Sequence, residues 1–392
     1  MTIKNLKQIS TQSKTGMATG IYAHVPFCAS TCDFCAFYQQ KPKRAELERY
    51  LRGISGELQL IQCTEAVDTV FWGGGTPGLL PAKDLAALGA TMRAHLNLAH
   101  LREWTVEMAP STVKADKIRV LREMGVTRVS MGVQSFQKTL LDKLGRLHSR
   151  QQIHRAYDLL RAEGIKNINL DLMFAIPGQS QAMWLEDLRH AIDLQPEHLS
   201  TYCLTFEEDT AMWLKLSAGH IRRNVEHEAD LYLTTWDTLA EHGYPQYEIS
   251  NFSRPGHQCI HNFNTWNMRQ WYGLGPSAAS QYRGMRFANP SCLDTWLAGI
   301  KAGELKRNEL SVLSDSLLAC DCLVFGLRMN AGVDLGAIGA RFPQVDLRPL
   351  QRLWGELVEQ QCLVNENSRI RLTAAGRLLA DRIGVRIMEI ME

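Results

Sequence analysis

The chain between residues 22 and 38 reads Tyr22-Ala23-His24-Val25-Pro26-Phe27-Cys28-Ala29-Ser30-Thr31-Cys32-Asp33-Phe34-Cys35-Ala36-Phe37-Tyr38. Residues 20–25 are apolar and predict a short strand. Cys28, Cys32 and Cys35 follow this strand with the spacing C-x3-C-x2-C. Three thiols on one short loop directly after a strand indicate a metal-binding loop.

The number of cysteines in the loop narrows the kind of metal site. A structural zinc or an ordinary electron-transfer [4Fe–4S] cluster takes four protein ligands. With three thiolates, one iron of a cubane keeps an open site, which a small molecule with an amine and a carboxylate can chelate. S-adenosylmethionine has both groups, and cofactor reactions of this type are radical reactions. The alternatives are a zinc loop completed by His24 or Asp33, or unrelated reduced thiols, although zinc cysteines usually come as two separated pairs.

The motif resembles that of a known superfamily. C-x3-C-x2-C after a strand, with Phe34 before the last cysteine, is similar to the radical SAM superfamily. The preceding residues 22–27 narrow the resemblance to the oxygen-independent coproporphyrinogen III oxidase group, which contains an oxidase and a heme chaperone. The resemblance extends from about residue 20 to residue 388 and implies a [4Fe–4S] cluster on Cys28, Cys32 and Cys35, with S-adenosylmethionine bound beside it.

Composition sets broad limits on the kind of protein. A chain of 392 residues, with 45% hydrophobic and 21% charged residues, fits a large α/β domain plus a smaller one. The formal charge of +2 gives no argument for nucleic acid. Three of the ten cysteines lie in the loop and no signal peptide is recognised, which predicts a reducing cytoplasm. No apolar run approaches about 18 residues, so no membrane span is expected.

From residue 20 the chain alternates short β-rich runs with longer amphipathic stretches. The expected strands are 20–25, 67–73, 103–108, 127–133, 167–174 and 198–204. The expected helices lie near 44–62, 82–95, 115–124, 137–163, 182–194 and 223–242. Alternating units of this kind predict a parallel sheet. The resemblance implies the α/β class and a partial (β/α)6 TIM-like barrel, whose site lies at the carboxyl ends of the strands.

Each of these strands is followed by polar or glycine-rich residues. Gly73-Gly74-Gly75-Thr76-Pro77 follows the second strand, where glycines allow close approach of a ligand and expose backbone N–H groups. Glu107 lies near the end of the third strand. If it does not contact a ligand, it is a carboxylate solvated by water. Asp171 lies within an apolar strand, where a carboxylate needs partners, and its alternative role is a structural hydrogen bond. The resemblance implies the following S-adenosylmethionine contacts: Tyr22, Phe34, Gly74, Gly75, Thr76, Glu107, Gln134, Arg146, Asp171 and Met173.

A second unusual segment is His261-Asn262-Phe263-Asn264-Thr265-Trp266, which is followed by a glycine-rich turn and a run of small residues. His261 could bind heme iron, as could Cys259. A His-Asn pair in a loop is usually structural. The segment nevertheless resembles the H-N-x-x-Y-W motif of the heme chaperone branch, which implies heme contact by His261. Thr265 stands where that motif has tyrosine, so a role of that phenol is absent or moved.

The last part of the chain changes character. Residues 310–328 predict a helix, 332–335 open a second helix, and 347–365 contain a third. Residues 369–373 predict a short strand before a final helix over 374–387. This order resembles a smaller, mainly helical winged-helix-like domain, but no helix concentrates Lys and Arg on one face as DNA binding requires. The expected division is a polar leader over 1–19, a barrel with its extension over 20–295, and a C-terminal domain over 300–392.

Two functions fit the resemblance. One is oxidative decarboxylation of coproporphyrinogen III. The other is a heme-binding chaperone that keeps the cluster and S-adenosylmethionine and transfers heme to acceptor apo-proteins. The oxidase has one more cysteine two residues after the cluster motif, where this chain has Phe37, and it has a longer N-terminal arm. These differences and the His261 segment favour the chaperone.

A third possibility is another radical SAM enzyme acting on tetrapyrroles, but no acceptor or nucleophile for such a reaction is identified. No catalytic residue is assigned. The expected partners are heme or a porphyrinogen, heme-accepting apo-proteins and an electron donor for the cluster, with no nucleic acid and no membrane span. The expected location is the cytoplasm.

Overall fold

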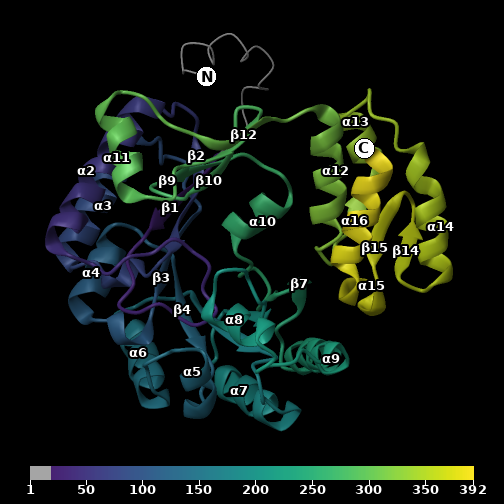
Figure 1. Cartoon of the computed structure of the whole chain (residues 1–392), viewed down its shortest axis with the longest axis horizontal. Helices are drawn as coiled ribbons and strands as arrows, with labels where there is room; N and C mark the ends of the chain where they lie inside the picture. The colour runs from purple at the N-terminus through teal and green to yellow at the C-terminus, as the bar shows by residue number, and fades with distance from the viewer. Residues whose placement is uncertain (1–18) are drawn as a thin grey trace.

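A parallel sheet forms the centre of the molecule (Figure 1). The computed structural model describes residues 19–392, and the expected polar leader lies outside them except for its last residue. Six neighbouring parallel strands follow one another in chain order within the sheet. They are β1 (Thr19–Val25), β2 (Val67–Gly74), β3 (Glu103–Met108), β4 (Arg128–Gln134), β5 (Ile168–Phe174) and β6 (His198–Cys203).

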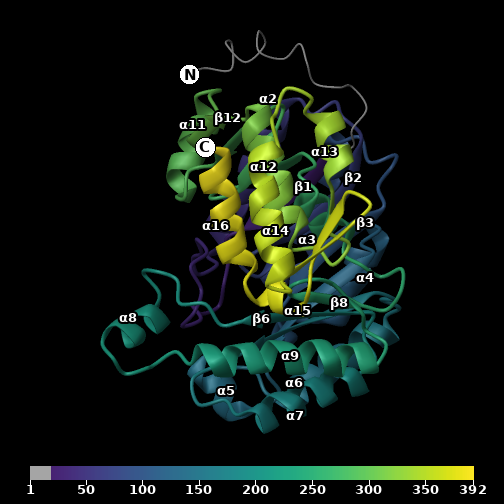
Figure 2. The same ribbon diagram turned by 90° about the vertical axis from the view of Figure 1, so that its right-hand side faces the viewer.

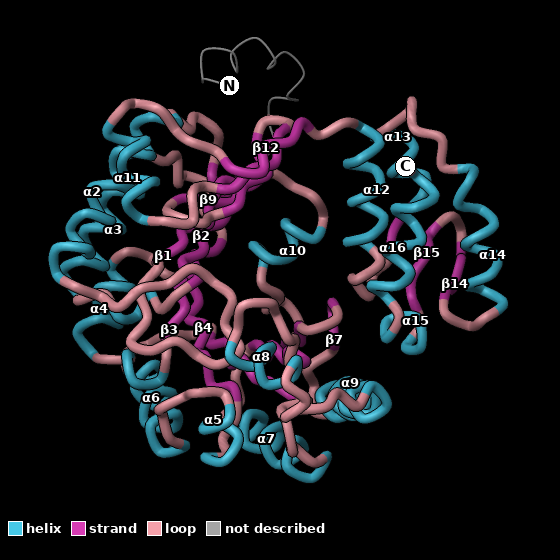
Figure 3. The backbone as a smooth tube through the Cα atoms, viewed as in Figure 1, coloured by secondary structure: helices cyan, strands magenta, loops and turns pink. Residues whose placement is uncertain are grey.

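Helices cover the outer, convex face of these strands, and Figure 3 shows the sheet curving inside them. They are α2 (Arg44–Ile61), α3 (Ala82–His95), α4 (Ala115–Glu123), α5 (Lys138–Lys143), α6 (Arg150–Ala162), α7 (Gln181–Asp193) and α9 (Val225–Glu241). Short 3-10 turns η1 (Pro77–Leu79) and η2 (Pro110–Thr112) follow β2 and β3. The single helix expected over 137–163 is two helices, because Gly145 and the capping serine Ser149 interrupt it. The partial barrel predicted from the resemblance is confirmed.

The sheet is wider than the six predicted strands. Within residues 19–392 it has twelve strands in the order β12-β11-β10-β9-β1-β2-β3-β4-β5-β6-β8-β7. The added strands are β7 (Gln246–Glu248), β8 (Asn251–Ser253), β9 (Trp271–Leu274), β10 (Ala279–Tyr282), β11 (Met285–Ala288) and β12 (Asn308–Val312). Three further helices connect them: α8 (Ala211–Ser217), α10 (Ile260–Trp266) and α11 (Leu293–Lys301). These strands have only three to five residues, which is too short for a periodic pattern to predict.

The C-terminal part packs its own apolar core around α12 and α16. Its elements are α12 (Asp315–Gly326), β13 (Val333–Asp334), α13 (Leu335–Arg341), η3 (Arg348–Leu350), α14 (Gln351–Glu359), β14 (Leu363–Glu366), β15 (Arg369–Leu372), α15 (Ala374–Leu378) and α16 (Ala380–Met391). The helix predicted over 310–328 is α12, but it begins at Asp315 and not at residue 310, because residues 308–312 pair with β11 as an edge strand. The final helix is broken at Leu379 into α15 and α16.

The short helix α10 lies between the barrel and the C-terminal part, as Figure 1 shows. Figure 2 shows the C-terminal helices in front of the barrel and α8 on a projecting arm. The Trp266 ring packs on Phe325 at 5.7 Å between centroids, and the Arg328 guanidinium lies 5.3 Å from the Trp266 centroid. The segment that carries the His-Asn motif is therefore held by both parts of the molecule. Among the described helices, none is long and apolar enough to cross a membrane.

Candidate functional site: the cysteine loop and the barrel interior

The cysteine loop leaves the carboxyl end of β1 and is tied at its base. The N–H of Cys28 donates to the carbonyl of Gln40 at 3.1 Å, and the N–H of Gln40 donates to the carbonyl of Pro26 at 2.7 Å. At its tip, the N–H of Asp33 donates to the carbonyl of Leu144 at 3.1 Å. The loop is thus fixed on one side to its own base and on the other to the turn that carries Arg146.

The three thiols lie close enough to influence one another. Burial raises the pKa of Cys28, Cys32 and Cys35, and a second cysteine of the loop raises that of Cys28 and Cys32 further. The positive charge of Arg146 acts in the opposite direction on all three. Within residues 19–392 no three side chains converge on the position of a single metal ion. A cubane requires no such convergence, because each thiolate binds a different iron.

The two residues considered as a fourth zinc ligand are already engaged. His24 bonds through Nε2 to the carbonyl oxygen of Tyr38 at 2.9 Å and through Nδ1 to the hydroxyl of Tyr22 at 3.2 Å. Asp33 pairs with the ammonium of Lys215 at 2.6 Å. Their side chains therefore do not complete a zinc site with the loop, and the donor set fits three thiolates of an iron–sulfur cluster.

The glycines after β2 fit tightly against this loop. Gly74 has φ +92°, and a Cβ on it would lie 2.1 Å from Nδ1 of His24. The N–H groups of Gly75 and Thr76 donate to the carbonyls of Val25 and Phe27 at 3.1 and 2.8 Å. The expectation that this turn exposes N–H groups is wrong, because protein acceptors take them. A ligand amine, which is a donor, has the carbonyl oxygens of the turn as its possible partners.

Glu107 lies behind the same turn. Its carboxylate accepts a hydrogen bond from the N–H of Gly74 at 3.2 Å, and a Cβ on Gly73 would lie 2.8 Å from Oε1. Burial raises the pKa of Glu107 to about 8, and the charge of Asp171 acts in the same direction. A ligand ammonium or hydroxyl at this point would give the carboxylate a favourable partner.

Arg146 and Gln134 face each other across Gly132. A Cβ on Gly132 would lie 3.1 Å from Nε2 of Gln134 and 3.5 Å from Nη2 of Arg146. Gln134 adopts φ +65°, and Arg146 lies 5.9 Å from the Phe34 ring centroid. Nε of Arg146 is buried without a hydrogen-bond partner among the described residues. An unpartnered guanidinium beside the cysteine loop suits the carboxylate of an amino acid.

The remaining predicted contacts surround the same space. The Asp171 carboxylate accepts from Ser130 Oγ and from Asn169 Nδ2, both at 2.8 Å. Met173, the next inward residue of β5, packs in a small apolar cluster with Phe34. The Tyr22 ring lies 6.3 Å from that of Phe71, and burial raises the pKa of its hydroxyl. The structure therefore brings together the loop, the glycine turn and the polar side chains at one end of the barrel.

His261 lies deeper in the barrel, away from this group. Its Nδ1 bonds to Oγ1 of Thr69 at 2.9 Å, its ring lies 5.3 Å from that of Phe71, and it is 7% exposed. Burial lowers its pKa to about 4, so the imidazole is neutral near pH 7. Cys259 is also buried, and its thiol donates to Glu103 at 3.4 Å.

The sequence analysis missed a polar lining of the barrel below Glu107 and Asp171. A cavity of about 40 Å³ is bordered by side chains including Thr105, Arg128, Ser130, Asn169, His198 and Ser200. These residues alternate along β3 to β6 at the inward positions, so a period of two in polar residues was the available signal. Arg128 is 2% exposed and pairs with Glu103 at 3.3 Å, and Nε and Nη1 of Arg128 have no partner among the described residues.

Comparison with known proteins agrees with this geometry. Residues 22–191 match the Radical SAM superfamily model, and residues 318–379 match the HemN C-terminal domain. The solved structure of coproporphyrinogen III oxidase HemN from Escherichia coli, a radical SAM enzyme, superposes with a TM-score of 0.85 at 21% identity. It covers 99% of this chain and 93% of that chain, and shows the shared fold.

Curated relatives narrow the family. The heme chaperone HemW of Lactococcus lactis is 32% identical over 367 residues, which cover 92% of this chain and 95% of the relative. The heme chaperone HemW of Bacillus subtilis is 32% identical over 372 residues, covering 92% and 97%. The resemblance drawn from residues 22–38 is confirmed. The chain belongs to the heme chaperone HemW family of the radical SAM superfamily.

Proposed function

We propose that this protein is a heme chaperone that holds a [4Fe–4S] cluster and S-adenosylmethionine and transfers heme to acceptor apo-proteins in the cytoplasm. The observation that carries the proposal is the convergence of the three-cysteine loop with Arg146, Glu107 and Asp171 in a chain of the HemW family. Further partners are an electron donor for the cluster and heme or a porphyrinogen.

The carboxyl ends of the barrel strands form the mouth of the barrel. Each group there has a distinct role in this proposal. Cys28, Cys32 and Cys35 would hold the cluster through their thiolates, and S-adenosylmethionine would bind beside them. With both groups bound, the site would supply the radical chemistry of the superfamily. The remaining predicted contacts orient the cofactor: Tyr22, Phe34, Gly74, Gly75, Thr76, Glu107, Gln134, Arg146, Asp171 and Met173.

The electrostatics of the mouth support these roles. Arg146 has a buried donor without a partner, which a methionine carboxylate would satisfy. The partly buried Glu107 and Asp171 carboxylates would receive donors from the amine and the ribose hydroxyls. The aromatic ring of Phe34 and the thioether of Met173 close the apolar side.

His261 is the proposed heme contact. Its bond to Thr69 occupies Nδ1, which orients the ring and leaves Nε2 as the nitrogen for iron. Because the side chain is 7% exposed, heme iron reaches it only when α10 turns or withdraws from the barrel. The tyrosine of the family motif is replaced by Thr265, whose hydroxyl donates to the carbonyl of His261 at 3.0 Å.

The proposal also includes a division of the chain into two units. We infer a barrel unit and a C-terminal unit, as the two separate apolar cores suggest. The boundary is placed after β12 and not at residue 300, because β12 pairs with β11 in the large sheet.

The experiment that tests the function is an anaerobic assay of the reconstituted protein with S-adenosylmethionine and a reductant. Parallel reactions receive coproporphyrinogen III or heme, and both decarboxylated product and heme retention are followed. We expect no decarboxylated product, with stoichiometric heme held and then released to an apo-protein. Product formed over many turnovers would instead assign the chain to the oxidase, despite Phe37.

Two sets of variants accompany this assay. Cys28→Ala, Cys32→Ala and Cys35→Ala should each fail to hold a full [4Fe–4S] cluster, whereas Cys292→Ala, which removes an exposed cysteine outside the loop, should hold it. His261→Ala should change the heme spectrum and lower heme affinity, with His242→Ala on the surface as its control. Full cluster content in the loop variants, or unchanged heme binding by His261→Ala, would contradict the respective assignment.

A further inference from the structure

A chain of side-chain hydrogen bonds crosses the barrel interior from Asp171 to the start of α10. Asn169 Nδ2 donates to Asp171 at 2.8 Å, and Asn169 Oδ1 lies 2.6 Å from Nδ1 of His198. His198 Nε2 lies 2.8 Å from the hydroxyl oxygen of Tyr247. The same oxygen accepts a hydrogen bond from the backbone N–H of Cys259 at 3.2 Å. Cys259 is the residue immediately before α10. Four contacts thus connect Asp171, a predicted S-adenosylmethionine contact, with the segment that carries His261.

The donors of this chain all point the same way. Because Asn169 donates its amide to the carboxylate, its oxygen must accept, so His198 carries its proton on Nδ1. His198 Nε2 is then an acceptor, and the Tyr247 hydroxyl donates to it. Burial lowers the pKa of His198 well below its usual value and raises that of Tyr247, which keeps one neutral and the other protonated. A chain with one direction that ends on a carboxylate is polarised cooperatively.

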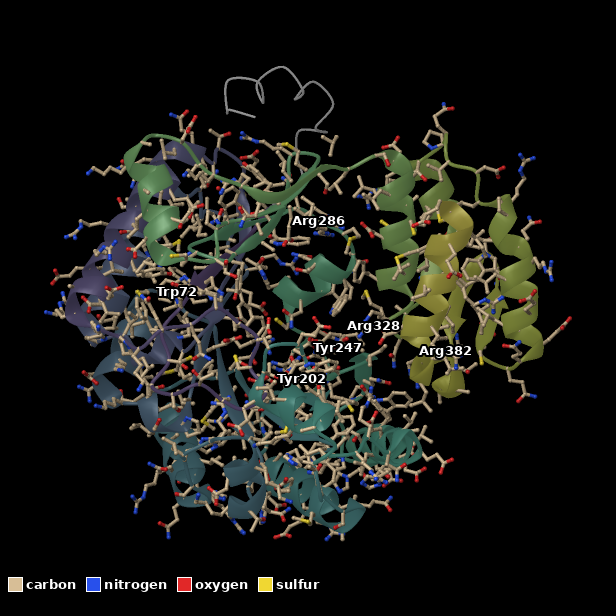
Figure 4. All side chains as sticks on the ribbon, viewed as in Figure 1. Trp72, Tyr202, Tyr247, Arg286, Arg328 and Arg382 are labelled. Carbon is tan, nitrogen blue, oxygen red and sulfur yellow. The ribbon has the colours of Figure 1, made fainter. Side chains whose placement is uncertain are left out.

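The chain is built into the sheet. Asn169 and His198 are direct neighbours in the parallel pairing of β5 with β6, and they are 4% and 1% exposed. Tyr247 lies on β7, and its carbonyl accepts the N–H of Asn330 from the C-terminal part at 3.0 Å. Figure 4 shows Tyr247 below α10, on the side that faces the C-terminal helices.

We propose that His198 and Tyr247 are positioning residues that hold the Asp171 carboxylate for S-adenosylmethionine and link occupancy of that site to α10. The proposal rests on the proposed function in one respect, the contact between Asp171 and the cofactor. A ribose hydroxyl bonded to Asp171 fixes the carboxylate, and each later bond of the chain is fixed in turn. The cofactor therefore steadies the first turn of α10, from which His261 projects, and heme binding becomes sensitive to the cofactor.

The test uses the full-length reconstituted protein and a matched pair of tyrosines. Tyr247→Phe removes the hydroxyl from the chain. Tyr244→Phe is the control, because Tyr244 is also buried and donates to the carbonyl of Pro196 at 2.8 Å, outside the chain. Asp171→Asn separately tests the cofactor contact. The readouts are the Kd for S-adenosylmethionine and hydrogen exchange of the peptide covering residues 257–266, with and without saturating cofactor.

In the wild type and in Tyr244→Phe, we expect S-adenosylmethionine to slow exchange of the 257–266 peptide. In Tyr247→Phe the cofactor should no longer slow it. The Kd should rise by up to about fivefold, because at most the free energy of one ordinary hydrogen bond is coupled to cofactor binding. A general loss of stability would affect the two tyrosine variants alike, and would leave the response to the cofactor intact.

The outcomes separate the proposal from its premise. If Asp171→Asn raises the Kd but Tyr247→Phe behaves as Tyr244→Phe does, the positioning roles are wrong and the cofactor contact stands. If Asp171→Asn leaves the Kd unchanged, the cofactor contact is wrong and the link falls with it. Equal exchange with and without cofactor in the wild type would also overturn the link.

Discussion

Glu107 places a carboxylate where little water reaches its charge. Its pKa of about 8, raised from 4.5 by burial and by Asp171, means that the folded protein holds a proton there more tightly than the unfolded chain does. The free energy of unfolding therefore falls as the pH rises from 4.5, the ordinary pKa, to about 8, the pKa in the folded protein. Above the folded-state pKa the loss is complete. This carboxylate therefore lowers stability at the place where the proposed cofactor binds.

Glu107→Gln should remove this pH dependence in the cluster-free protein. Relative to the wild type, the variant should gain stability as the pH rises from about 5 to about 8 and keep the gain above that. Urea unfolding at several pH values measures this difference in stability. Glu359→Gln, at an exposed position, is the control. A stability difference between variant and wild type that does not change with pH would contradict the assignment.

At the scale of elements, the barrel mouth depends on how closely β2 approaches the loop after β1. The turn 74–76 bonds to the carbonyls of Val25 and Phe27, and Gly74 leaves no room for a Cβ beside His24. The glycines thus serve two purposes, because they shape the turn and they also fix the base of the cysteine loop.

Gly74→Ala should lower the free energy of unfolding by about 2–4 kcal/mol, because the new Cβ meets His24 and the backbone is in the left-handed region. Cluster content after reconstitution should fall with it. Gly256→Ala is the matched control, since Gly256 has φ +82° and nothing within 4 Å of the added Cβ. That variant should lose only about 1–2 kcal/mol and keep its cluster. Equal losses and equal cluster content in the two variants would show that close packing at Gly74 is unimportant.

At the scale of the whole molecule, α10 joins the two parts. On one side His261 and Asn264 bond to Thr69 and Asp68 of β2. On the other side Trp266 packs against Phe325 and Arg328. The ion pair between Arg286 and Asp321 at 2.7 Å provides a second contact between the parts. If heme reaches His261 by a movement of α10, as proposed, that movement also breaks the contacts of Trp266 with the C-terminal part.

Trp266→Ala should weaken this docking by about 1–3 kcal/mol, through loss of the ring stack and the cation–π contact. We expect urea unfolding followed by circular dichroism to show two transitions in place of one, and faster proteolysis between β12 and α12. Trp213→Ala on the projecting helix α8 is the control for the loss of a tryptophan. A single transition at the wild-type midpoint would show that α10 does not hold the two parts together.

Local patterns were enough to predict several features of this chain. Cys28, Cys32 and Cys35 lie on one loop, so their spacing in the sequence is enough to indicate a metal-binding site. The six long strands have clear periodicity, and their observed bounds differ from the predicted ones by one residue or none at each end. Most of the helices between them agree as closely, but the stretch 137–163 is two helices and α9 begins at Val225 and not at residue 223. The strands β7 to β12, which include the edge strand that begins at residue 308, were missed, because segments of three to five residues form strands only when a neighbour pairs with them.

The sequence by itself determined the three-cysteine loop and the alternation of strands and helices, because each depends on residues near one another in the chain. The partial barrel and the list of groups at its mouth came from the resemblance to a family. Only the tertiary structure decided where His261 lies and which side chains connect it to Asp171. Asn169, His198, Tyr247 and Cys259 come from separate segments. Their contacts exist only because β5 pairs with β6 and β7 lies beyond β8 in the same sheet. Hydrogen bonds between such distant residues have no local pattern, since the sheet and not the sequence sets their spacing.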